Sequence, residues 1–297
     1  MTAPHALPVE PAAARDKRVA TTPTPADLAL TVRDRRSGRG AQRQRWWANG
    51  SAVATAWFNA LSATFPRGEG FFIDSVRACR EGAPPQLEAE IRDFIKQEVN
   101  HTREHLAFNR AAVEAGYDLT GIEAHIEKML SLTRGRPAVV NCAATMALEH
   151  WTALFANQLL SRPDHLAGAE QSVADMWRWH AIEEIEHKGV AFDTYLHAAR
   201  GWPALRRWWL RSLMMVLVSK NFLYHRVLDT LDLLAQDGIT GWQARRMVAA
   251  YLLWQPGFLR RIFPAWLAYF KPGFHPWDHD DRALIAAAER ELGPATA

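Results

Sequence analysis

The chain has 297 residues, of which 48% are hydrophobic and 23% charged, and its formal net charge is only +3. This balance is typical of a globular protein with one large domain or two smaller ones, and it excludes a chain-wide basic surface for nucleic acid. The two cysteines, Cys79 and Cys142, exclude a disulfide scaffold and predict a cytoplasmic protein whose metal ligands are His and carboxylate groups.

Residues 1–40 are rich first in Pro and Ala and then in Arg, which predicts a disordered N-terminal arm. The next segment, residues 46–66, carries no charge, and its length would allow a membrane span. Its Asn, Ser, Thr and Gly residues are too polar for a hydrocarbon core. We therefore predict a buried helix there and no stable membrane span.

The rest of the chain predicts helices separated by Gly and Pro, without a convincing strand. Pro66 is expected to break or kink the first helical stretch, and Pro256 and Pro264 to interrupt a late one. The Trp-rich residues 202–224 suit packing within the protein or against a second copy in a homodimer, and the alternative is that they lie on a membrane surface. The predicted helical segments are 51–64 with a second piece to about 81, 86–114, 120–133, 138–160, 168–198, 204–236, 241–270 and 280–292.

Two Glu-x-x-His motifs lie in mid-helix, and each follows a helix that carries a Glu in apolar surroundings. Bare buried carboxylates would repel one another at a cost of several kcal/mol, whereas two divalent cations would neutralise them. This order is that of ferritin-like di-metal carboxylate bundles. We therefore predict an all-α fold, with a ferritin-like four-helix bundle over residues 41–200 and additional C-terminal helices over 201–297 packed on it. The predicted ligands in these motifs are Glu69, Glu98, His101, Glu149, Glu184 and His187.

A further histidine, His180, precedes Glu184 by one helical turn, so that His180, Glu184 and His187 share one helix face. This His-x-x-x-Glu-x-x-His pattern resembles the last metal helix of di-iron arylamine N-oxygenases, which implies that His180 is also a ligand. The alternative is that His180 only contacts a ligand or lies in the core. Glu183 and Glu186 flank the same face and are expected to face solvent or to hydrogen-bond a ligand His.

A second resemblance covers most of the chain, roughly residues 30–285. Several longer motifs in this range resemble the bacterial family of predicted metal-dependent hydrolases, and this resemblance implies a metal-dependent activity. The matching motifs are Phe65-Pro66-x-Gly68-Glu69-x-Phe71-Phe72, Gln97-Glu98-x-x-His101, Ala147-Leu148-Glu149-His150, Trp179-His180-x-x-Glu183-Glu184-x-Glu186-His187-Lys188 and Phe274-His275-Pro276-Trp277.

The ligand chemistry favours iron, with manganese or zinc as alternatives, because carboxylate-rich sites with a few imidazoles suit these ions. The first expectation is a non-haem di-iron oxidoreductase that activates dioxygen to oxidise a small organic substrate. One alternative is a metal-dependent hydrolase whose two ions activate water. Another is a non-enzymatic metal-binding or storage protein. No catalytic residue is predicted beyond the ligands.

Overall fold

The computed structural model describes residues 24–25, 27–37 and 44–293, and across these ranges all regular structure is helical. The predicted all-α class is therefore confirmed. The specific ferritin-like relationship and the three-part division of the chain stay predictions. The helices are α1 (Ala52–Cys79), α2 (Pro85–Glu114), α3 (Thr120–Ser131), α4 (Ala138–Ser161), α5 (Gln171–Glu186), α6 (Val190–Ala198), α7 (Ala204–Gln236), α8 (Gly241–Leu253), α9 (Phe258–Ala268) and α10 (Arg282–Leu292), with single 3-10 turns at Pro163–Leu166 and Pro276–Asp278.

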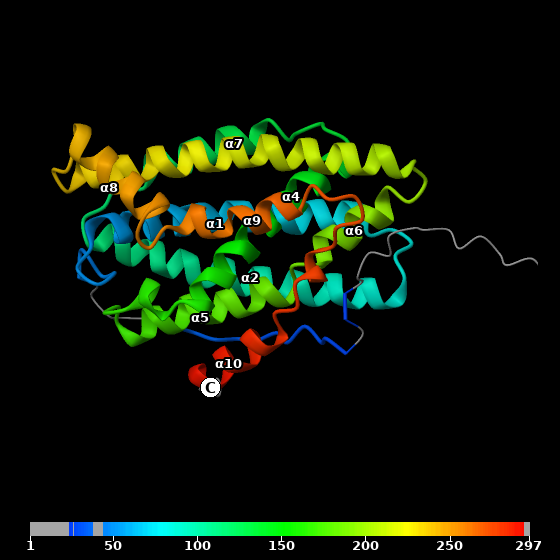
Figure 1. Cartoon of the computed structure of the whole chain (residues 1–297), viewed down its shortest axis with the longest axis horizontal. Coiled ribbons are helices and arrows are strands. Elements are labelled where there is room, and N and C mark those ends of the chain that lie inside the picture. Colours follow the sequence, from blue (N-terminus) through cyan, green and yellow to red (C-terminus); the bar gives the residue numbers. More distant parts are fainter. Residues whose placement is uncertain (1–23, 26, 38–43, 294–297) are drawn as a thin grey trace, which may run out of the picture.

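Helices α1, α2, α4 and α5 surround one interior (Figure 1). Helix α1 packs on α2 and α4, while α5 packs on α4 and touches α2. The long helix α7 lies across α1 and α4, with α8 and α9 beside it, and α10 packs on α5. The C-terminal helices therefore cover the outside of the inner four, which supply the residues of the candidate site.

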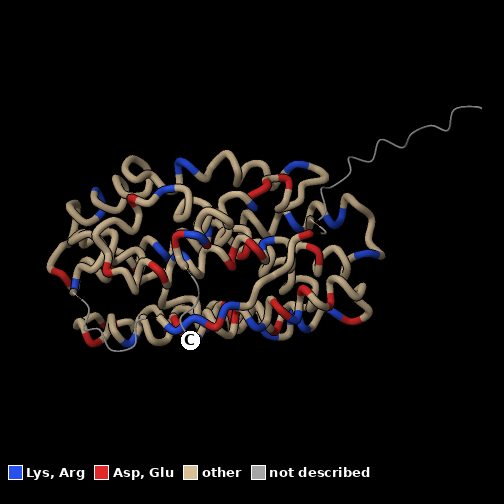
Figure 2. The backbone as a smooth tube through the Cα atoms, turned by 90° about the horizontal axis from the view of Figure 1, so that it is seen from below, with Lys and Arg blue, Asp and Glu red and all other residues tan. Residues whose placement is uncertain are grey.

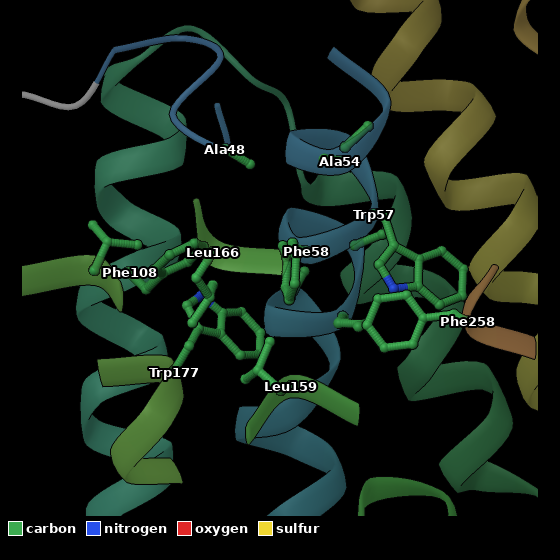
Figure 3. Packing of buried hydrophobic residues seen from close by; sticks show 14 of the residues in the cluster. Ala48, Ala54, Trp57, Phe58, Phe108, Leu159, Leu166, Trp177 and Phe258 are labelled. Atoms are coloured by element: carbon green, nitrogen blue, oxygen red, sulfur yellow. The ribbon is translucent and has the colours of Figure 1, made fainter. Parts of the chain in front are cut away.

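Large aromatic side chains fill one end of this interior (Figure 3). The ring centroids of Phe58 on α1 and Trp177 on α5 lie 4.9 Å apart, and the nearby Trp57 is fully buried. Burying such rings removes roughly 150–250 Å² each from water, which dominates the local stability. The prediction of a buried helix after Trp46 is confirmed for the part that forms α1.

Helix α1 continues through Pro66, so the helix does not break there, while the alternative prediction of a kink stays a prediction. Proline lacks the N–H that would bond to the carbonyl oxygen four residues earlier, on Ser62. The side chain of Asn109 on α2 replaces that donor, because its Nδ2 donates to Ser62 O at 3.2 Å. In addition, Ser62 Oγ donates to Asn109 Oδ1 at 2.7 Å. A tertiary contact thus satisfies the carbonyl that local sequence leaves without a partner.

Replacing this amide should destabilise the protein. We expect Asn109→Ala to lower the free energy of unfolding by about 1–3 kcal/mol, since a buried carbonyl loses its donor. Gln86→Ala, at an exposed position of the same helix, is the matched control and should leave stability within about 0.5 kcal/mol of the wild type. Urea denaturation measures both variants, and equal midpoints would contradict this account of Pro66.

The predicted helix over residues 168–198 is two helices in the structure, α5 and α6, separated at His187, Lys188 and Gly189. The chain turns where Gly189 approaches other segments closely. A Cβ on Gly189 would lie 2.6 Å from Thr24 Oγ1 and 3.1 Å from the ring of Trp277. In the same turn, Lys188 Nζ donates a hydrogen bond to Asp281 Oδ2 at 2.6 Å. These distant partners were not visible in the local periodicity.

The predicted helix over residues 241–270 is also divided, into α8 and α9, with Pro256 between them. Pro264, which was expected to interrupt it as well, lies inside α9. The other predicted segments agree with the structure to within a few residues.

Charged residues of both signs are scattered over the molecule in the view of Figure 2. None of the helices in the described ranges is long and apolar enough to cross a membrane. The expected lack of a nucleic-acid partner stays a prediction.

Candidate metal centre

The interior of the four inner helices holds all seven residues that the sequence predicts as ligands. Helix α1 supplies Glu69, α2 supplies Glu98 and His101, α4 supplies Glu149, and α5 with its C-terminal residue supplies the rest. No residue of the set is more than 3% exposed. The predicted ligands on α5 and just beyond it are His180, Glu184 and His187.

These side chains form overlapping groups in which every candidate ligand atom lies within 4.8 Å of the others. The groups share members, so they form one continuous centre that spans all four helices. His105, which was not in the predicted ligand set, joins one of them. The groups are Glu98, Glu149 and His187; His101, His180 and Glu184; Glu69, Glu98 and His101; and Glu69, His105 and His180.

Many polar atoms of this centre are buried without a hydrogen-bond partner. A buried polar atom without a partner costs about 1–3 kcal/mol, and more if it is charged, so their concentration in one place requires an explanation. Divalent cations would supply the missing partners and the neutralising charge. The atoms are Glu69 Oε1, both carboxylate oxygens of Glu98 and of Glu149, Glu184 Oε2, His101 Nδ1 and His187 Nε2.

The spacing between these atoms also fits shared ions. His187 Nε2 lies 3.3 Å from Glu98 Oε1 and 3.3 Å from Glu149 Oε2. On the other side, His101 Nδ1 lies 3.6 Å from Glu184 Oε1 and 3.8 Å from Glu98 Oε1. Two ligand atoms that each lie about 2.1 Å from one ion are roughly 3–3.5 Å apart. The 3.3 Å pairs at His187 match this spacing and the pairs at His101 are slightly wider, so the residues present fit divalent metal ions, with Glu98 between the two histidines.

Hydrogen bonds outside the centre fix the orientation of two histidines. His101 Nε2 bonds Glu183 Oε2 at 2.9 Å, which leaves Nδ1 facing the centre. His187 Nδ1 bonds Gln97 Oε1 at 3.0 Å, which leaves Nε2 facing the centre. Such bonds to the far nitrogen are typical of metal-binding histidines, because they set the tautomer and hold the ring. Of the two flanking carboxylates, Glu183 makes the expected bond to a histidine, whereas Glu186 bonds Gln97 instead.

Residues 27–37 of the N-terminal segment close this outer network, while the predicted disorder of residues 1–40 as a whole stays a prediction. Residues 27–37 run beside α5 and α10 (Figure 1), while residues 1–23 lie outside the described residues. The backbone N–H of Arg33 donates to Glu183 Oε1 at 2.9 Å, and its guanidinium donates to both oxygens of Glu186. The composition predicts disorder because the segment has few large apolar residues. Its contacts are polar and involve carboxylates far away in the sequence, so composition does not reveal them.

Arg33 is therefore expected to support the metal centre from outside. Arg33→Ala should lower metal affinity by about 10- to 100-fold, because the network that orients His101 and His187 loosens. Arg36→Ala is the control, because the exposed Arg36 pairs only with exposed Asp34 among the described residues. Competition with a chelator measures both affinities, and an unchanged affinity in Arg33→Ala would contradict a supporting role.

Burial raises the pKa of Glu69 and of Glu98 well above the usual range, and repulsion from neighbouring carboxylates adds to the effect. Burial likewise raises the pKa of Glu149 to about 7. Burial also acts to raise the pKa of Glu184, but attraction to His180 and His187 outweighs it and lowers that pKa. Without metal, burial thus favours the protonated form of Glu69, Glu98 and Glu149 over the charged form.

Metal binding should therefore release protons. Because the pKa of Glu149 is raised, its carboxyl keeps a proton below about pH 7 and must lose it to bind an ion, so affinity should fall as the pH falls. Calorimetric titration with Mn²⁺ near pH 6, in two buffers of different ionisation enthalpy, measures the release. Equal heats in both buffers would contradict it.

A small cavity of about 40 Å³ lies against His180 and Glu184. Its other walls are mainly apolar and aromatic, including Phe65, Phe155 and Trp177. That volume accommodates a molecule the size of water or dioxygen but not an organic substrate. One further residue contacts the centre and was not predicted from the sequence. This residue is Thr102, whose hydroxyl donates a hydrogen bond to Glu69 Oε2 at 2.7 Å.

The fold and the centre together define a helical protein with a buried candidate site for metal ions. Residues 31–280 match the family model described as predicted metal-dependent hydrolase, so the chain belongs to this family. The resemblance found in the sequence motifs is thereby confirmed. No curated protein and no solved structure matches the chain.

Proposed function

We propose that the protein is a metal-dependent hydrolase whose buried centre holds two divalent metal ions and acts on a small, largely apolar substrate. The observation that supports this most is the convergence of unpartnered carboxylate and imidazole atoms from four helices. Membership of the hydrolase family supports the hydrolytic reaction over an oxidative one. The ligand assignment of all seven predicted residues is part of the proposal.

When bound, the two ions would supply a nucleophilic water and polarise the scissile group. The chain's own residues perform the supporting tasks. Glu98 and Glu184 each face both His101 and His187, so they hold the two halves of the centre together. The aromatic walls beside His180 restrict the entry of bulk water, which strengthens electrostatic interactions at the centre.

A second candidate is the oxidation of an organic substrate with dioxygen at a di-iron centre. The observation that favours it is the apolar lining of the cavity against His180 and Glu184, which suits dioxygen. Iron would then be the resident ion, whereas zinc or manganese would suit hydrolysis equally well.

One preparation tests both candidates. Metal analysis of the purified full chain should give about two ions, and the loaded protein should hydrolyse an apolar ester such as 4-nitrophenyl hexanoate. The metal-free protein is the control. Turnover that requires reduced iron and consumes oxygen, with no ester cleavage, would replace the first candidate by the second. Two bound ions without either activity would favour a binding or storage role.

A further inference from the structure

A second and larger cavity lies beside the metal centre, between α1, α3, α4 and α7. Its volume of about 360 Å³ falls within the roughly 300–1,000 Å³ typical of small-molecule pockets. This volume is too small for a helix of a partner protein. We propose that this cavity binds a single alkyl or acyl chain that carries an anionic group at its outer end and a hydrolysable bond towards its inner end, and that it delivers this bond to the metal centre.

The shape of the cavity follows one face of α4. Val140, Ala144, Leu148 and Thr152 line it at four-residue spacing, while Glu149 on the same helix faces the metal centre. Twelve residues of helix from Val140 to Thr152 correspond to about 18 Å, so the cavity is long as well as narrow. Most of the lining is apolar, which suits an extended hydrocarbon chain.

The inner end of the cavity adjoins the metal centre. Phe65 and Thr152 line this cavity and also the small one that touches His180 and Glu184. The Phe65 ring contacts the rings of His105 and His180, with centroids 4.5 and 4.9 Å apart. A molecule in the long cavity is therefore separated from His180 by a single aromatic side chain.

The charges of the lining indicate an anionic rather than a cationic head group. The described lining residues include Arg136 and Arg226 but neither Asp nor Glu. Arg226 is buried and already paired with Asp229 and with Ala60 O. Arg136 is exposed in the loop before α4, where its Nε donates to Leu132 O at 2.7 Å. The anionic group would therefore lie at the open end beside Arg136.

Gly68 is the position on α1 at which a substitution can fill the cavity. Glycine inside a helix costs about 1 kcal/mol relative to alanine, yet α1 carries Gly68 at the cavity wall. A Cβ on Gly68 would meet no atom within 4 Å, so the position leaves space in the cavity. Gly70 in the same helix also has free space at its Cβ but does not line the cavity. The two glycines therefore form a matched pair for mutation.

The test is the binding of dodecanoate to the full chain, measured by calorimetry with and without metal. Gly68→Leu should weaken binding at least about tenfold, and Gly70→Leu should leave it unchanged. Arg136→Gln should weaken dodecanoate binding about twofold to fivefold without affecting dodecanol. Ala144→Phe is a second way to fill the cavity if Gly68→Leu misfolds by circular dichroism.

Binding of dodecyltrimethylammonium as tight as that of dodecanoate would overturn the anionic assignment. Equal dodecanoate affinity in the wild type, Gly68→Leu and Ala144→Phe would overturn the site itself. The inference rests on the proposed function only for delivery to the metal centre. Because binding is measured without turnover, dodecanoate binding by a protein that hydrolyses nothing would refute the proposed function and leave the binding site standing.

Discussion

Glu98→Gln is expected to remove at least one metal ion per chain and to abolish metal-dependent activity. The carboxylate of Glu98 is fully buried, and neither oxygen has a hydrogen-bond partner. Its Oε1 lies 3.3 Å from His187 Nε2 and 3.8 Å from His101 Nδ1, between the two histidines that face the centre. An amide has the same shape but no charge, so it would leave the two cations without the carboxylate between them.

Elemental analysis of purified Glu98→Gln and of the wild type checks this result. Glu114→Gln, at an exposed position near the end of the same helix, is the control and should keep full metal content. The metal-free variant should unfold at the same temperature as the metal-free wild type or higher, because burial of the Glu98 carboxyl is unfavourable without metal. Full metal content in Glu98→Gln would exclude Glu98 as a ligand.

The candidate site was more predictable from sequence than the details of the fold. Ligand spacing is a local property of a helix, so Glu98 with His101 and Glu184 with His187 could be recognised without knowing how the helices pack. The placement of Glu69 and Glu149 followed from charge, because isolated carboxylates on apolar helix faces need a partner. The structure brings these residues together, while their role as ligands stays a prediction.

The features that the sequence did not predict depend on contacts between distant residues. Asn109 supplies a donor to Ser62 O where α1 continues past Pro66, and Gly189, between α5 and α6, leaves room for the close approach of Thr24 and Trp277. Arg33 fixes Glu183 and Glu186 from a segment whose composition resembles a disordered tail. Local propensity and periodicity carry no information on such pairs, so they remained hidden until the helices were placed.

His180→Ala is expected to separate metal binding from activity. Two of the four groups of candidate ligands do not include His180, so at least one ion should remain bound; they are Glu98 with Glu149 and His187, and Glu69 with Glu98 and His101. Among the predicted ligands, however, only His180 and Glu184 line the small apolar cavity. His180 is also held at both ring nitrogens, by Glu184 at 2.8 Å and by His105 at 2.5 Å. Its loss should therefore disturb the side of the centre that faces substrate.

We expect kcat of His180→Ala to fall roughly 10- to 100-fold or more while metal content falls far less than in Glu98→Gln. The exposed His279 provides the control, because His279→Ala should change neither quantity. Added imidazole should restore part of the activity, since the adjoining cavity leads to the space that the His180 ring occupied. Complete loss of metal would make His180 an essential ligand, and unchanged kcat would place it outside the reacting site. Unchanged kcat would also move the reaction away from the His180 side, since Glu184 alone would then connect the cavity to the ions.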